Sequence, residues 1–149
     1  MTEPRNSHFE QAVRDSFAAQ QLMVTIGARL ARVVAGEVEI RVPFRTDLTQ
    51  QHGFLHAGVV TSALDTACGY AAFSLMPAGT GVLSVEFKAN LLAPARGDEL
   101  IARGRVVRAG RTITVCQADA FMRTGADEVL TATMLATMIT VLDRPDVRG

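Results

Sequence analysis

The sequence predicts an α+β fold in which an antiparallel β-sheet wraps around one long central helix. The segment from Ala57 to Met76 is long, rich in alanine and lacks strand-like alternation, as is typical of a helix buried on most sides. Four strand-like segments follow it, and the connections between them are of turn length. Consecutive strands joined by such short turns are mostly antiparallel, and a sheet that packs on one helix is an α+β architecture.

The N-terminal segment, residues 1–22, is predicted to be helical and part of the same domain. Apolar side chains recur there at every fourth position, namely Phe9, Val13 and Phe17. Ser7 is placed to cap this helix, and Glu10 follows three residues later, as in a capping box. A helix over residues 7–21 is therefore expected.

A hairpin is expected next, before the central helix. Residues 26–34 are predicted to form a strand, and a turn follows at Ala35 and Gly36. Polar and apolar residues then alternate from Glu37 to Val42, which indicates a half-buried strand that ends at Pro43. The two strands together would form one edge of the sheet.

The remaining strands follow the central helix. Alternation and β-branched residues place them at residues 83–91, 100–108, 112–123 and 130–142. A sheet that covers its helix with one face still has another face or an open edge to protect. At least a homodimer is therefore expected.

Length and composition narrow the class of protein. The 149 residues suit a single domain spanning 1–149, and 48% hydrophobic residues can form a core without disulfides or metals. The 15 basic and 15 acidic residues balance, which argues against nucleic-acid or membrane-surface partners. The polar N-terminus lacks the apolar region of a signal peptide, and Cys68 and Cys116 have no metal-ligand spacing. We expect a cytoplasmic protein with reduced, buried thiols and no membrane span.

Asp65 is the strongest candidate for a functional residue. Between Gly53 and Leu83 the titratable side chains are His56, Asp65, Cys68 and Tyr70, so the carboxylate lies in an almost uncharged, apolar helix. No Lys or Arg lies three or four residues away on either side. Such a carboxylate is rare unless it is functional or pairs with a distant group, and both alternatives stay open.

The residues before the helix are also candidates. His56 could shape the turn through a hydrogen bond to the backbone, or could act as a base. The first N–H groups of the helix lack intrahelical partners and form a natural anion site. His52 and His56 are four residues apart but separated by Gly53 before the helix begins, so no zinc site is expected.

Two stretches, residues 50–58 and 63–65, resemble the loop and helix start of PaaI-type hotdog thioesterases. Their sequences are QQHGFLHAG and ALD, and the likeness continues through residues 81–87, 92–98 and 107–111. It covers most of the chain from about Ile26 to Val141. The resemblance implies a hotdog fold and hydrolysis of an acyl-CoA thioester, with an aryl or a short- to medium-chain acyl group.

The resemblance also implies a role for each site residue. Asp65 would be the nucleophile or general base, and the backbone N–H of Ala57 would bind the thioester oxygen. Gln50 would orient the attacking water or the carbonyl, and Ser84 would assist from a neighbouring strand. His56 would hold the loop. The chemistry would need no metal and no cofactor.

The resemblance extends to substrate binding and assembly. Gly58 and Thr66 are expected to contact the substrate. In this family the site lies at a dimer interface, so Asp65 and Gln50 would come from different subunits of a homodimer or homotetramer. Ala57 replaces the first glycine of the family's His-Gly-Gly pattern, and Gln50 is a longer amide than the usual asparagine, so the acyl group is the open question.

The same fold also supports two other functions. The first is a non-catalytic module that binds or senses acyl-CoA, since a fold alone does not determine function. A bare carboxylate such as Asp65 argues against it, because it would repel an anionic ligand. The second is an enoyl-CoA hydratase, which would need His five residues after Asp65, where Tyr70 stands.

Overall fold

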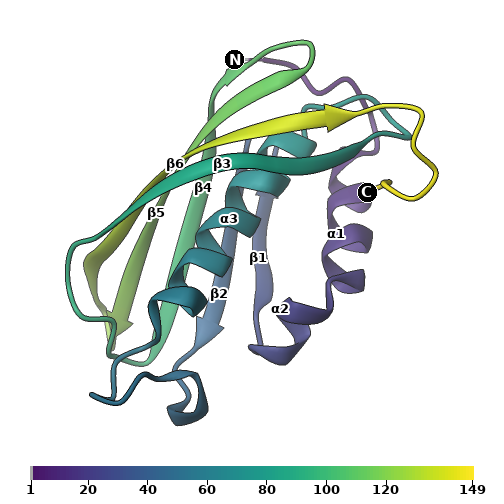
Figure 1. Ribbon diagram of the computed structural model, residues 1–149. Coiled ribbons are helices and arrows are strands. Elements are labelled where there is room, and N and C mark those ends of the chain that lie inside the picture. The colour runs from purple at the N-terminus through teal and green to yellow at the C-terminus, as the bar shows by residue number, and fades with distance from the viewer. Residues whose placement is uncertain (1) are drawn as a thin grey trace.

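The computed structural model describes residues 2–149 as one antiparallel sheet around one long helix (Figure 1). The sheet has six strands in the order β1-β2-β4-β5-β6-β3. The elements along the chain are α1 (Phe9–Ala19), α2 (Gln21–Thr25), β1 (Arg29–Val34), β2 (Glu37–Pro43), the 3-10 turn η1 (Thr46–Leu48), α3 (Ala57–Phe73), β3 (Gly81–Leu91), β4 (Glu99–Ala109), β5 (Ile113–Thr124) and β6 (Asp127–Val141). The predicted α+β hotdog fold is confirmed.

The central helix α3 packs so closely on the sheet that one strand must present a glycine to it. A β-carbon on Gly104 of β4 would come within 2.5 Å of the carbonyl atoms of Ala67 on α3. Small and branched side chains of α3 fill the rest of this contact, with Val60, Ala63 and Leu64 almost fully buried. The helix axis is therefore set by contact between backbones.

α3 ends at Phe73, three residues before the predicted end at Met76. Beyond it the backbone tightens, because the N–H groups of Leu75 and Met76 bond to carbonyls three residues back, before Pro77. The buried hydroxyl of Ser74 completes this end: it donates to Ala71 O at 2.7 Å and accepts from Gly36 N at 2.8 Å.

The N-terminal region departs most from the prediction. Ser7 does not cap α1; His8 occupies the cap position without a side-chain bond. The short helix α2 was not predicted as a separate element; it lies just before the residues assigned to the first strand, and its C-terminal cap, Ile26, was assigned to that strand. Gly27, at φ +70°, ends this second helix, so β1 begins at Arg29 rather than Ile26.

The strands after α3 follow the predicted order with shifted ends. β6 begins at Asp127, three residues earlier than predicted, because Thr124 and Asp127 already pair across the turn that joins it to β5. The two thiols are buried, and burial raises the pKa of Cys116 to about 12 and that of Cys68 further. They therefore stay protonated.

β3 is an edge strand with an apolar surface. It pairs with β6 on one side only, and its other edge is free within one chain. The exposed fractions of Val85, Phe87 and Leu91 are 55%, 46% and 56%. Exposed apolar side chains along a free strand edge favour pairing with another chain.

Candidate active site

The N-terminus of α3 is organised by His56. Its Nδ1 accepts a hydrogen bond from Gly58 N at 2.8 Å, and its carbonyl accepts from the N–H groups of Val59 and Val60 at 2.9 and 3.3 Å. Among residues 2–149, nothing accepts a hydrogen bond from Ala57 N. One donor at the positive end of the helix is thus left for an external oxygen.

Gly58 is needed for this cap. A β-carbon there would lie 3.0 Å from Nδ1 of His56, tighter than an ordinary contact. The glycine therefore lets the imidazole reach the backbone. Gly58 itself is exposed and lines neither of the two cavities described below.

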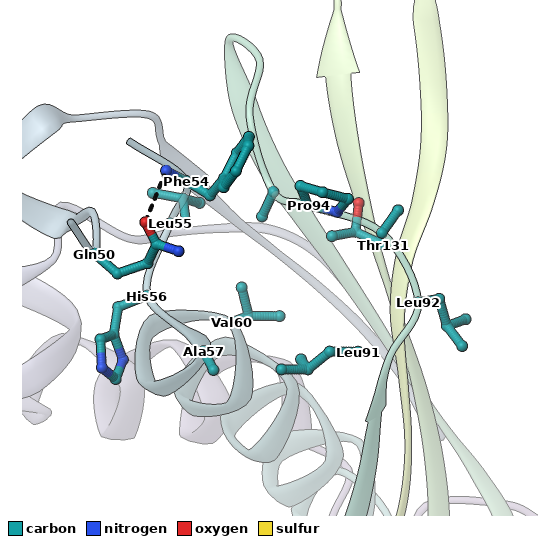
Figure 2. A pocket seen from close by; sticks show the side chains of 12 residues that line it. Gln50, Phe54, Leu55, His56, Ala57, Val60, Leu91, Leu92, Pro94 and Thr131 are labelled. Carbon is teal, nitrogen blue, oxygen red and sulfur yellow. Dashed lines mark hydrogen bonds between the residues drawn. The ribbon is translucent and has the colours of Figure 1, made fainter. Parts of the chain in front are cut away.

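The loop before the helix is held by Gln50. Its backbone N–H donates to Phe54 O at 2.9 Å, and its side-chain oxygen accepts from the N–H of His52. The same oxygen also accepts from the N–H of Phe54 (Figure 2). Because both partners are donors, the accepting atom is the amide oxygen. The amide NH₂ has no acceptor in the part of the chain that the structure describes, and it stays available to a ligand.

A cavity of about 450 Å³ lies at this end of α3 (Figure 2). Its polar wall carries Gln50, His56 and Ala57, and the rest is mostly apolar: Phe54, Leu55, Val60, Leu91, Leu92, Ala93, Pro94, Ala95 and Thr131. A concave apolar site with a few placed polar groups is typical of ligand binding.

Asp65 lies on α3, eight residues after Ala57. It is half-buried. Its Oδ1 accepts a 2.7 Å hydrogen bond from Oγ of Ser84 on β3. Within residues 2–149 it forms no ion pair, and its second oxygen has no donor, so that oxygen is free to act on a ligand.

A second, smaller cavity of about 170 Å³ adjoins this carboxylate. Thr66 lines it, and its buried hydroxyl donates to the side-chain oxygen of Gln20 at 3.2 Å. Gln20 also contacts the hydroxyl of Tyr70 at 3.5 Å, which bonds Ser16 at 3.1 Å. Burial raises the pKa of Tyr70, so its hydroxyl keeps its proton.

The predicted site residues thus fall into two groups within one chain. Gln50, His56 and Ala57 share the larger cavity, whereas Asp65, Thr66 and Ser84 share the smaller one. Eight residues of helix separate Ala57 from Asp65, a rise of about 12 Å. One thioester carbonyl cannot contact both within a single chain.

Sequence reasoning missed Gln20 and assigned no role to Tyr70. Tyr70 follows Thr66 by one helical turn, so its place beside the second cavity could have been inferred from helical periodicity. Gln20 comes from the α1–α2 junction, 46 residues away from Thr66. No local pattern signals such a tertiary contact.

Residues 52–129 match the family model described as the thioesterase superfamily, which is more than half of the chain. The chain belongs to the thioesterase superfamily. The prediction that this protein is a thioester hydrolase is thereby confirmed. Among the described residues, no three His, Cys, Asp or Glu side chains are grouped to hold a metal ion, and no helix has the length and apolar character to cross a membrane.

This thioesterase is similar to several known proteins, some of which have solved structures. A thioesterase family protein from Silicibacter pomeroyi is 51% identical, with a TM-score of 0.88, over 90% of this chain and 98% of that one. The PaaI protein from E. coli shares the fold, with a TM-score of 0.83 at 17% identity, over 93% and 96% of the two chains. A relative from Halobacterium salinarum that bears an esterase name is 34% identical over 64% of this chain and 66% of its own length, just under two thirds.

Proposed function

We propose that this thioesterase hydrolyses an acyl-CoA to the free acid and CoA, in sites that two copies of the chain build together. The observation that supports this most directly is the distance along α3 between Ala57 and Asp65. Ala57 N and Asp65 each have a free hydrogen-bonding capacity, yet about 12 Å of helix lies between them. The cavity at Ala57 lacks a carboxylate that can act as nucleophile or base, and the cavity at Asp65 lacks the free helix N–H that can bind the carbonyl oxygen.

The edge strand β3 offers the surface for the second copy. Ser84, which holds Asp65, lies on this strand, so the carboxylate lies beside the free edge. In a twofold dimer the same surface is used by both copies. Two α3 helices on either side of that axis run antiparallel, and Asp65 of one copy lies toward the α3 N-terminus of the other.

The reaction uses Asp65 from one copy of the chain and the Ala57 N–H from the other. Asp65 either attacks the thioester carbonyl carbon itself as a nucleophile, or acts as a base that takes a proton from the water molecule that attacks this carbon. Negative charge develops on the carbonyl oxygen, where the Ala57 N–H, with the Gln50 amide beside it, stabilises it. The C–S bond then breaks, and the CoA thiolate leaves and takes up a proton. In the base route the proton that Asp65 took from water passes to the thiolate. In the nucleophile route water then cleaves the anhydride between Asp65 and the acyl group, which releases the acid and restores the carboxylate. In both routes water supplies the oxygen gained by the acid and the proton gained by the thiol.

Mixing two inactive variants tests the shared site. Asp65→Asn and Ala57→Pro each remove one half, since proline has no N–H to donate. After unfolding together and refolding at equal amounts, half of the dimers carry one copy of each. Every such heterodimer has one intact site out of two, so about a quarter of wild-type activity should return.

The control is each variant refolded alone, which should stay inactive. Circular dichroism and sedimentation establish first that each variant is folded and dimeric. A mixture no more active than its components would mean that each chain holds its own complete site. A non-catalytic acyl-CoA module would instead show wild-type protein that binds acyl-CoA and releases no thiol.

A further inference from the structure

The hydrogen bond between His56 and Gly58 specifies the charge of the His56 ring. Nδ1 accepts from the backbone N–H of Gly58 at 2.8 Å. A backbone N–H can only donate, and an imidazole nitrogen accepts only when it carries no proton. This bond therefore assigns the ring proton to Nε2. The cap at the start of α3 exists only while His56 is neutral.

The same cap fixes the direction of the Ala57 N–H. Ala57 lies between the two residues that the bond joins, and its N–H shares one planar peptide unit with the His56 carbonyl. That carbonyl accepts from Val59 N at 2.9 Å and from Val60 N at 3.3 Å. With the carbonyl held on one side and the ring bound to Gly58 on the other, the peptide unit has one orientation.

The ring of His56 is exposed, so protons from solvent can reach it. The segments beside it are the preceding loop, where His56 N donates to Leu48 O, and the connection from β3 to β4, where Ala95 O accepts from Leu55 N. Among residues 2–149, no charged or titratable group of these segments forms a hydrogen bond or ion pair with the ring, and Arg45 and Asp47 pair with each other. These groups are Arg45, Asp47, His52, Arg96 and Asp98.

The one charged residue on α3 itself is Asp65. In the dimer proposed above, Asp65 of the partner subunit lies toward this end of the helix. A carboxylate there favours the protonated ring, whereas the positive end of the helix opposes it. The charge of His56 is therefore a property of the dimer, and the dimer is the species to measure.

We propose that His56 is a positioning residue that makes hydrolysis depend on pH, an inference that rests on the proposed function. A proton on Nδ1 would face the N–H of Gly58, so two donors would meet and the bond would be lost. The first turn of α3 would loosen, and the Ala57 N–H would no longer point at the thioester oxygen. Since histidine side chains change charge between about pH 5 and 8, activity falls as the pH is lowered through this range.

Two amide substitutions of His56 test this role. His56→Asn places an oxygen close to the position of Nδ1, where it accepts from Gly58 N as a favoured helix cap and takes up no proton. His56→Gln is closer in size to histidine, but its oxygen lies further out, near the position of Nε2. At pH 8, kcat for acyl-CoA hydrolysis should fall about tenfold in His56→Gln, and His56→Asn should recover most of the wild-type rate.

The decisive readout is the pH profile of kcat between about pH 5 and 8. The wild type should lose activity toward the acid end, and the loss due to His56 should be missing in His56→Asn. His52→Asn is the matched control: that exposed ring contacts the side chain of Gln51, and the variant should keep the wild-type profile. Circular dichroism and sedimentation establish that each variant is folded and dimeric.

Two results would overturn the inference. The first is a His56→Asn profile with the same acid loss as wild type, which would assign that loss to another group. The second is equal activity of His56→Asn and His56→Gln at pH 8, which would mean that an acceptor at the Nδ1 position does not matter.

Nitrogen-15 NMR of the wild-type dimer tests the same bond without turnover. At pH 8 the His56 ring should carry its proton on Nε2, and the amide signal of Gly58 should change together with the ring signals as the pH is lowered. A proton on Nδ1 at pH 8, or a Gly58 amide that does not follow the ring, contradicts the inference. A wild-type protein that releases no thiol at any pH removes the proposed function instead, and leaves the NMR result to decide whether the cap depends on charge.

Discussion

Oγ of Ser84 donates a 2.7 Å hydrogen bond to Oδ1 of Asp65, which joins the edge strand β3 to the middle of α3. One carboxylate oxygen is thereby fixed while the other stays free. The same bond places the carboxylate next to the edge where we propose that a second copy binds.

Loss of this hydroxyl should weaken catalysis without harming the fold. Ser84→Ala removes one hydrogen bond to a charged group, and kcat should fall about tenfold or somewhat more. Ser84→Thr keeps the hydroxyl and should recover much of the rate. Thiol release under saturating acyl-CoA measures both. Equal activity of wild type and Ser84→Ala would show that the bond has no part in the reaction.

Asp65→Asn should lower turnover by at least about two orders of magnitude, because the amide cannot accept a proton or attack. The unfolding midpoint should change little, since the carboxylate is half-buried and its bond to Ser84 can persist. Asp47→Asn, an exposed carboxylate paired with Arg45, is the matched control. Near-normal hydrolysis in Asp65→Asn would remove it from the mechanism.

Two substitutions of Ala57 distinguish the role of its backbone N–H from the role of its side chain. Ala57→Gly keeps the N–H and should keep most activity, at a cost in stability of at most about 0.5–1 kcal/mol. Ala57→Pro is compatible with the first helical turn but lacks the donor, and the rate should fall roughly 10²–10³-fold. A folded, dimeric and fully active proline variant would place the oxyanion donor elsewhere.

The edge strand should control assembly and activity together. Phe87→Lys puts a charge on the apolar surface of β3, and the variant should sediment as a monomer with almost no activity. Leu22→Lys on α2 is a control of similar exposure, 50% against 46%, and should stay dimeric and active. An active Phe87→Lys monomer would contradict both the interface and the shared site.

Glu39 should contribute to stability above acidic pH. Its carboxylate accepts from Arg41 at 2.7 Å and from Arg103 at 2.9 Å. Partial burial raises its pKa, but the bonds from Arg103 and Arg41 outweigh this and hold it below its usual value. The stabilisation is therefore present above the unfolded-state pKa and is lost as pH falls through the lower folded-state pKa.

Urea unfolding measures this contribution. Glu39→Gln should be less stable than wild type by about 1–2 kcal/mol at neutral pH, and the difference should shrink as pH falls toward about 3. Glu37→Gln, which breaks an exposed pair with Arg32, should change stability far less. A difference between Glu39→Gln and wild type that is constant with pH would exclude the proposed origin.

The sequence was most informative where one local pattern decides the structure. The alanine-rich stretch after His56 predicted α3 and its start, and alternation predicted the strands that follow. The end of α3 was placed too late because the tightened turns before Pro77 depend on a tertiary bond from Gly36 to Ser74. The helix α2 was missed because five residues carry too little periodicity to indicate a second, separate helix.

The site was predictable only in part, for a similar reason. His56 and Asp65 stand out by residue type and spacing along one helix. Gln20 reaches the second cavity through contacts with Thr66 and Tyr70 that only the folded chain creates. Likewise, the sequence named Gln50 without indicating that its oxygen is already used by its own loop.

The helix α3 both packs on the sheet and carries the residues of the site. The contact of Gly104 with the carbonyl of Ala67 makes the first of these independent of the second. Because main-chain atoms meet there, the height of α3 above the sheet does not depend on which side chains its opposite face carries. Residues around the small cavity can therefore be exchanged while Asp65 and the helix N-terminus keep their places. New acyl preferences could arise on this scaffold by single substitutions, with the reaction itself inherited unchanged.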